Sequence, residues 1–279
     1  MKTKILSILA LLLTVTQGAW AQTYTATFAT GNDNTGWTIE PTSDVEGVTV
    51  TVSYSGENKV KSVTVKAMTL SGLKTAINAA SDLSDLNTKY LGKYVTAAGT
   101  LQGTSTGAIG VVAYISKSGV DADYADSRIL VLALTDANSS CTWQTSNTSA
   151  CSTDAERTRW KNTESLYGYN FSYYAHNYES YPANYAAINY SASRPSGASL
   201  WFMPTIKQWE LMYGAVGNNN PDTMASAANL EIIGYYWAAT ESTSYDWAAF
   251  RFGCGCDEIY ILSDSPKDTN HRVRAIFAY

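Results

Sequence analysis

The most constraining feature of the sequence is its last segment, residues 235–279. Two regular ends, Tyr236–Glu241 and Arg272–Ala275, enclose a middle of unusual composition. That middle contains Cys254 and Cys256, two of the four cysteines of the chain, within a glycine-containing stretch. Regular ends around an irregular insert are typical of a recognition surface carried on a scaffold, so we expect function to lie here.

The first 21 residues have the features of a secretory signal. Lys2 and Lys4 precede an apolar stretch, and Ala19-Trp20-Ala21 forms a small-x-small cleavage site. The apolar stretch is too short to span a bilayer, and no later stretch approaches the ~20 apolar residues that a spanning helix needs. We therefore expect an exported protein without a transmembrane segment, at the cell surface, in the periplasm or secreted.

The composition restricts the class of partner. Only 15% of the residues are charged, and the net charge of −5 is spread along the chain. Nucleic acid and anionic membranes require clustered Lys and Arg, so we expect neither as a partner. Tyr, Ser, Thr, Ala and Asn are abundant, as is typical of an all-β or α+β extracellular protein.

The cysteines form two different pairs. Cys141 and Cys151 enclose a polar loop, and a disulfide between them would stabilise the fold by about 2–3 kcal/mol. Export permits such a disulfide. The alternatives for Cys254 and Cys256 are a strained bridge, free thiols, a bridge to the first pair, or metal binding. We expect no metal, because structural zinc usually requires C-x2-C spacing and further ligands.

Periodicity divides the mature chain into two folded parts. Residues 22–66 are expected to form a small β module, since alternating runs at 48–54 and 60–65 flank a short Gly/Asn turn. Residues 67–85 are expected to be a linker, formed either by a short helix or by ordered coil. Residues 86–279 are expected to be one domain.

Within that domain, strands are expected at 94–95, 110–115, 128–134, 235–239, 248–252 and 272–277. A helix is expected at 204–214, with Pro204 in its first turn. Asp154–Tyr167 lies in a polar, tyrosine-rich tract and is also expected to contain a helix.

Three motifs of this domain resemble a known family. Trp201–Glu210 resembles the "WRLPT…EW" helix, Tyr236–Glu241 the "YWSSTE" strand and Arg272–Arg274 the "RVRPV" strand of the C-type lectin fold, in its formylglycine-generating-enzyme-like branch. The resemblance covers residues 86–279. It implies an α+β fold, with a C-type lectin-fold domain preceded by the small all-β module, as in exported Bacteroidetes-type proteins. Trp247 with Phe252 resembles the "AW…F" that follows the strand motif of the family. The resemblance therefore also places four tryptophans in the core: Trp201, Trp209, Trp237 and Trp247.

The resemblance extends to the variable proteins of diversity-generating retroelements, in which adenine-directed mutagenesis changes codons of the last strands. Within 248–271, only Glu258 and Lys267 fall outside the set that mutated asparagine codons encode. Ordinary composition also places most residues inside that set. Two hypotheses follow, a diversified binding domain and an undiversified one.

The sequence favours neither calcium binding nor enzymatic chemistry. Asp257, Glu258, Asp264 and Asp268 are irregularly spaced oxygen donors, which indicates a solvated acidic loop rather than a calcium site. The sequence around Cys254 and Cys256 does not match the active-site cysteine region of the formylglycine-generating enzymes. We therefore expect no catalytic residue and no cofactor.

We expect a ligand-binding protein whose ligand is an unidentified protein or glycan. The alternative is a structural or adhesive subunit of a cell-surface or pilus assembly. The residues expected to contact the ligand are Asp246, Ala248, Phe250, Arg251, Cys254, Cys256, Asp257, Tyr260, Asp264, Asp268, Asn270 and His271.

Overall fold

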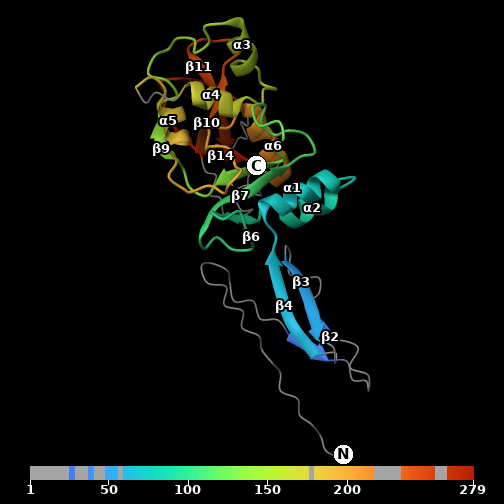
Figure 1. Cartoon of the computed structure of the whole chain (residues 1–279). Coiled ribbons are helices and arrows are strands. Elements are labelled where there is room, and N and C mark those ends of the chain that lie inside the picture. Colours follow the sequence, from blue (N-terminus) through green and yellow to red (C-terminus); the bar gives the residue numbers. More distant parts are fainter. Residues whose placement is uncertain are drawn as a thin grey trace, which may run out of the picture. The chain divides into compact units, whose positions relative to one another are not determined.

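The computed structural model describes residues 25–28, 37–40, 48–55, 59–175, 179–216, 234–254 and 263–279; Figure 1 shows its elements. The chain divides into two compact units, Met1–Met68 and Thr69–Tyr279. Helices and mainly antiparallel sheets make the fold class α+β, as the sequence predicts. The expected secretory signal lies outside the described residues. In the described part of the chain, no helix is long and apolar enough to cross a membrane.

The smaller unit contains two strand pairs. β1 (Thr25–Phe28) pairs with β2 (Trp37–Glu40), and β3 (Val48–Ser55) pairs with β4 (Lys59–Ala67), both in antiparallel fashion. The second pair is the hairpin that the alternating runs predict.

The segment expected to be a linker mostly belongs to the larger unit. It forms α1 (Leu70–Ala79) and the beginning of α2 (Ser84–Tyr90). The Oγ1 of Thr69 accepts a hydrogen bond from the backbone N–H of Gly72 (3.1 Å), which caps α1. Leu73 and Ile77 are fully buried, so apolar spacing at i and i+4 anchors this helix to the domain.

Two five-stranded sheets form the centre of the larger unit. The order of the first is β14-β8-β7-β5-β6. The order of the second is β12-β11-β10-β13-β9, in which β13 runs parallel to β10. Their bounds are β5 Tyr94–Thr96, β6 Leu101–Gln102, β7 Ala108–Ile115, β8 Ile129–Ala133, β9 Asn138–Cys141, β10 Gly234–Glu241, β11 Ala248–Cys254, β12 Ser263–Pro266, β13 His271–Val273 and β14 Ile276–Ala278.

Four further helices accompany the sheets: α3 Asp154–Trp160, α4 Gly168–Tyr174, α5 Pro182–Ile188 and α6 Ile206–Val216. α6 begins two residues later than expected, because Thr205 and Gln208 form a reciprocal cap. The backbone N–H of Gln208 donates to Thr205 Oγ1 (3.1 Å), and that of Thr205 donates to Gln208 Oε1 (2.9 Å). Pro204 therefore lies before the helix rather than in its first turn.

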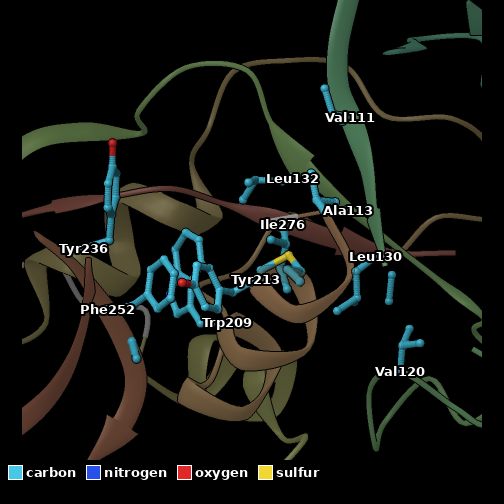
Figure 2. Close-up of a cluster of buried hydrophobic side chains, with 14 of the residues drawn as sticks. Val111, Ala113, Val120, Leu130, Leu132, Trp209, Tyr213, Tyr236, Phe252 and Ile276 are labelled. Carbon is cyan, nitrogen blue, oxygen red and sulfur yellow. The ribbon is translucent and has the colours of Figure 1, made fainter. Parts of the chain in front are cut away.

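The core joins α6 to both sheets (Figure 2). Trp209 of α6 stacks on Phe252 of β11, with ring centroids 4.7 Å apart and planes 4° apart. Leu132 of β8 and Ile276 of β14 belong to the same buried cluster. Burial of each such side chain contributes about 1.5–3 kcal/mol, so the core holds β10 and β11 firmly.

The three motifs that carry the family resemblance meet in this core. The indole N–H of Trp209 donates to the carbonyl of Trp237 (3.4 Å). The backbone N–H of Ile206 donates to Thr240 Oγ1 (3.0 Å). The Nη2 of Arg274 lies 3.3 Å from the hydroxyl of Tyr236. Helix motif, strand motif and closing strand are thus one packed assembly.

The prediction that all four motif tryptophans lie in the core is wrong for one of them. Trp201, Trp209 and Trp237 are buried, but Trp247 is 44% exposed. The β10–β11 register shifts between Trp237 and Glu241, and Trp247 lies beyond the paired residues, in the connecting loop.

Cys141 and Cys151 are buried free thiols rather than a disulfide. Cys141 ends β9, whereas the thiol of Cys151 donates to Glu241 Oε2 (3.3 Å) at the end of β10. The thiol of Cys151 is thus used in a hydrogen bond to a carboxylate from another strand.

Candidate binding surface

Among the described residues, an exposed aromatic pair lies on the loop that joins β10 to β11. We name residues 242–247 the aromatic loop. Tyr245 and Trp247 are 49% and 44% exposed, and their ring centroids lie 5.1 Å apart with planes tilted by 33°. Asp246 between them is also exposed. The loop thus presents two large rings side by side to solvent.

Local hydrogen bonds fix the backbone of the aromatic loop. The backbone N–H groups of Ser244 and Tyr245 both donate to Ser242 Oγ, each at 3.1 Å. The backbone N–H of Ala248 donates to the carbonyl of Tyr245 (3.2 Å), and that of Ser242 donates to the carbonyl of Ala248 (3.0 Å). These bonds close the loop from within.

The fully buried side chain of Lys267 holds the aromatic loop in place. Its Nζ donates to the carbonyls of Asp246 and Thr148, each at 2.6 Å, and to Glu241 Oε1. The backbone N–H of Lys267 also donates to the carbonyl of Trp247 (3.0 Å). Because these contacts reach backbone carbonyls, the ammonium group fixes the shape of the loop.

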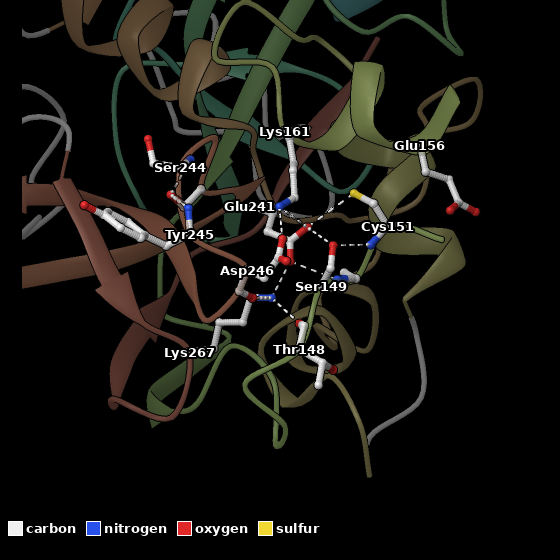
Figure 3. A network of polar contacts seen from close by, with 12 residues as sticks. Thr148, Ser149, Cys151, Glu156, Lys161, Glu241, Ser244, Tyr245, Asp246 and Lys267 are labelled. Atoms are coloured by element: carbon white, nitrogen blue, oxygen red, sulfur yellow. Dashed lines mark hydrogen bonds and ion pairs between the residues drawn. The ribbon is translucent and has the colours of Figure 1, made fainter. Parts of the chain in front are cut away.

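Glu241 is the acidic partner at the centre of this network, and Figure 3 shows Lys161 and Lys267 pointing toward it. Its Oε1 accepts from the backbone N–H of Ala150 (2.8 Å), and its Oε2 from Ser149 Oγ and Cys151 Sγ, both at 3.3 Å. Burial lowers the pKa of Lys267, and the neighbouring Glu241 opposes that shift. A buried pair with several additional hydrogen bonds of this kind positions its surroundings.

A second ion pair reaches the rim of the loop. Lys161, directly after α3, pairs with the exposed carboxylate of Asp246 and lies 3.8 Å from Glu241 Oε2. The hydrogen bond from Lys161 holds the pKa of Asp246 below its usual value. The loop is therefore tied to α3 as well as to β12.

The predicted contact residues divide into three groups. Asp246, Asp264, Asp268 and Asn270 are exposed, as a contact surface requires. Asp268 Oδ2 accepts from Asn147 Nδ2 (3.2 Å), and Arg251 is partly exposed. Cys256, Asp257 and Tyr260 lie outside the described residues, and so does the side chain of Cys254.

Three predicted contact residues point inward. Ala248 is fully buried at the start of β11. Phe250 is partly buried and packs against the core cluster. His271 is 8% exposed, because the parallel pairing of β13 with β10 places its ring 4.4 Å from that of Trp237. Ala248 and His271 therefore do not belong to an exposed contact surface.

The His271 ring is part of the scaffold. Its Nε2 lies 2.8 Å from Ser265 Oγ, and burial, together with the charge of Arg251, lowers the pKa of His271 to about 4. The imidazole is therefore neutral at physiological pH.

The described thiols are poor nucleophiles. Burial raises the pKa of Cys141 to about 12, and burial with the adjacent Glu241 does the same for Cys151. Both thiols stay protonated, whereas nucleophilic cysteines need a thiolate. Within the described ranges, no group of three or more His, Cys, Asp or Glu residues is arranged to hold a metal ion.

Sequence reasoning missed the aromatic loop and its anchor. The family resemblance places Trp247 in the core with the other motif tryptophans, although Ser242-Thr243-Ser244 before it is typical of a loop. Lys267 carried a usable signal, since it is one of two residues in 248–271 outside the asparagine-codon set.

Comparisons with known proteins identify no family. No protein-family model matches the sequence, and no curated protein matches it. Among solved structures, a fimbrial protein from Bacteroides ovatus ATCC 8483 is similar, with 14% sequence identity and a TM-score of 0.44. The match covers 68% of this chain and 48% of the fimbrial protein, so the chain spans about half the length of that protein. Similarity at this level does not establish a shared fold or a shared function.

Proposed function

We propose that this protein is an exported ligand-binding protein whose larger unit, a C-type lectin-fold domain, recognises its ligand with the aromatic loop and neighbouring late strands. One observation carries the proposal: Tyr245 and Trp247 are exposed side by side on a loop that a fully buried lysine holds in place. Rigid aromatic side chains supply contact area at low entropic cost, and preorganisation preserves that gain on binding.

The C-type lectin assignment is supported by the packing of the three motifs. Trp209, Trp237 and Arg274 come from separate parts of the sequence, and each contacts another motif.

The test compares two variants with the wild-type protein on a glycan array and against a displayed-peptide library. Tyr245→Ala combined with Trp247→Ala should abolish binding to the wild-type hits and leave the thermal unfolding midpoint nearly unchanged. Tyr173→Ala is the matched control, since Tyr173 is a 62% exposed tyrosine on α4. Hits that the double variant binds as tightly as the wild type would remove the aromatic loop from the proposal.

We also propose that a retroelement diversifies the late segment. Lys267, which mutated asparagine codons do not encode, is the buried anchor, whereas Asp264, Asp268 and Asn270 are exposed. Diversification of this kind requires a fixed scaffold under a changeable surface. Inspection of the encoding DNA is the test: absence of a nearby reverse transcriptase and of a near-copy of the 3′ end differing at adenines would end this proposal.

A second candidate function is a subunit of a cell-surface assembly. The observation that favours it is the separate N-terminal unit of strands β1–β4, a suitable docking piece. Deletion of residues 23–66 should then release the protein from the cell surface. Retention of the shortened protein at the surface would count against the docking role.

A further inference from the structure

The three arginines of the late strands differ in their partners. Arg272 Nη1 and Arg274 Nε share the carboxylate of Asp136, at 2.7 and 2.8 Å. Arg251, on β11, has no carboxylate within 4.0 Å among the residues that the structure describes. An arginine left without an acidic partner on a folded surface can bind an external anion at small cost in reorganisation.

Two contacts fix the plane of the Arg251 guanidinium. Its Cζ lies 3.9 Å from the ring centroid of Tyr235, and its Nε donates to Ser263 Oγ (2.8 Å). Neither contact uses the edge formed by Nη1 and Nη2. Stacking and one hydrogen bond therefore orient the group and leave its second fork of N–H donors for a ligand.

The described neighbours of Arg251 on this face carry no negative charge. Tyr235 lies between Arg251 and the neutral His271, with the Tyr235 and His271 rings 5.7 Å apart. Asp264 follows Ser263 on β12, but it pairs with Phe250, so strand alternation places it on the opposite face. Nothing described on the Arg251 face compensates the guanidinium charge.

We propose that Arg251, stacked on Tyr235 and held by Ser263, binds an anionic oxygen group of the ligand: a carboxylate, a sulfate or a phosphate. All three groups offer two oxygens to the parallel N–H donors of the guanidinium. The inference rests on the proposed function, since it gives the ligand a chemical class. The site lies in the middle of β11, whereas the aromatic loop precedes that strand.

The experiment titrates the full mature protein with acetate, sulfate and inorganic phosphate at constant ionic strength, and follows backbone amide and His271 ring signals by NMR. At least one anion should produce saturable shifts at Tyr235 and Ser263 and raise the pKa of His271. Arg251→Gln should weaken that binding at least tenfold. Arg251→Lys, which keeps the charge without the fork, should give an intermediate affinity.

Arg159→Gln is the matched control, because Arg159 also lies over a tyrosine ring, 5.2 Å from that of Tyr167. It should bind the anion as the wild type does. The anion that binds most tightly separates acidic peptides from sulfated or phosphorylated ligands.

Two results would overturn the inference. One is equal anion affinity of the Arg251→Gln variant and the wild type. The other is binding that requires Asp257→Asn and Glu258→Gln, since the partner of Arg251 would then be internal. The proposed function is tested separately by the Tyr245→Ala and Trp247→Ala double variant. This variant should still bind the simple anion but lose the ligands that need the aromatic loop. A double variant that keeps those ligands would contradict the proposed function and leave the Arg251 inference standing.

Discussion

β10 is flanked by charged clusters at its two ends, and the clusters differ in burial. At the C-terminal end of β10, Glu241 pairs with Lys267, and both side chains are fully buried. Near its start, Tyr236 lies beside Arg274 and Arg272, which share Asp136; Arg272 is 42% exposed. The buried cluster supports the exposed aromatic loop, whereas the more open cluster ties β13 to the segment before β9. The surface proposed to bind ligand therefore depends on a fully buried ion pair, whose disruption should cost more than that of the partly exposed cluster.

Lys267→Met should have the largest effect. Among the described cations, it leaves the buried Glu241 with only the longer 3.8 Å contact to Lys161, and loss of one partner of a buried pair costs about 3–5 kcal/mol. The free energy of unfolding from urea titration is the measurement. Adding Glu241→Gln, which removes the charge and keeps an acceptor for Ala150, should recover at least half of the loss. If the free energy of unfolding of Lys267→Met alone lies within about 1 kcal/mol of the wild-type value, burial does not distinguish the two clusters.

Two buried groups without an ionic partner extend the comparison. Among the described residues, Asp121 accepts from neutral donors alone: the backbone N–H groups of Tyr169 and Asp123 and the amide of Gln208. Burial raises the pKa of Asp121 to about 6. Its folded state holds the proton more tightly, so its contribution to stability falls as pH rises from about 4 to 6. His271 has its pKa lowered to about 4, so its contribution falls as pH drops from about 6.5 to 4.

The two contributions oppose each other, and each amounts to at most about 3.5 kcal/mol. Relative to the wild type, Asp121→Asn should show stability that rises more steeply with pH between about 4 and 6. His271→Gln should show the reverse. Urea unfolding at several pH values measures both differences. Identical pH profiles for wild type and both variants would mean that neither group titrates differently on folding.

Substitutions of the two arginines that share Asp136 should differ in their cost to stability, because the two side chains differ in burial. Arg274→Gln should cost about 2–3 kcal/mol, since Arg274 is 3% exposed and its Nη1 donates to the carbonyls of Ala133 and Leu134. Arg272→Gln should cost at most about 1 kcal/mol, because an exposed ion pair contributes little. Equal costs would show that sharing Asp136, rather than burial, sets the contribution.

The predictable part of the fold is the part governed by local periodicity. The strands β7, β8, β10 and β11 and the helix α6 follow from alternation and helical spacing. The α+β class follows as well. These signals depend only on neighbouring residues, so one sequence suffices to find them.

The site depends on contacts that local patterns do not contain. Glu241 accepts hydrogen bonds from Ala150 and Cys151, which lie about 90 positions away in the sequence, and Cys151 is a free thiol rather than part of the expected disulfide. His271 was expected at the surface as a polar residue beside the variable segment. Parallel pairing of β13 with β10 buried it, and only tertiary structure reveals such pairing.

Asp246→Asn should have the smallest effect, and its size tests how the aromatic loop is held. The Asp246 carboxylate is exposed and pairs with Lys161, so its loss should cost less than about 1 kcal/mol, and less still at high salt. Lys267 reaches the carbonyl of Asp246, which the substitution retains. The indole signal of Trp247, assigned in NMR spectra with Trp247→Phe, should therefore not move, and ligand binding should persist. A shifted Trp247 signal in this variant would mean that the surface ion pair, and not the buried lysine, sets the shape of the loop.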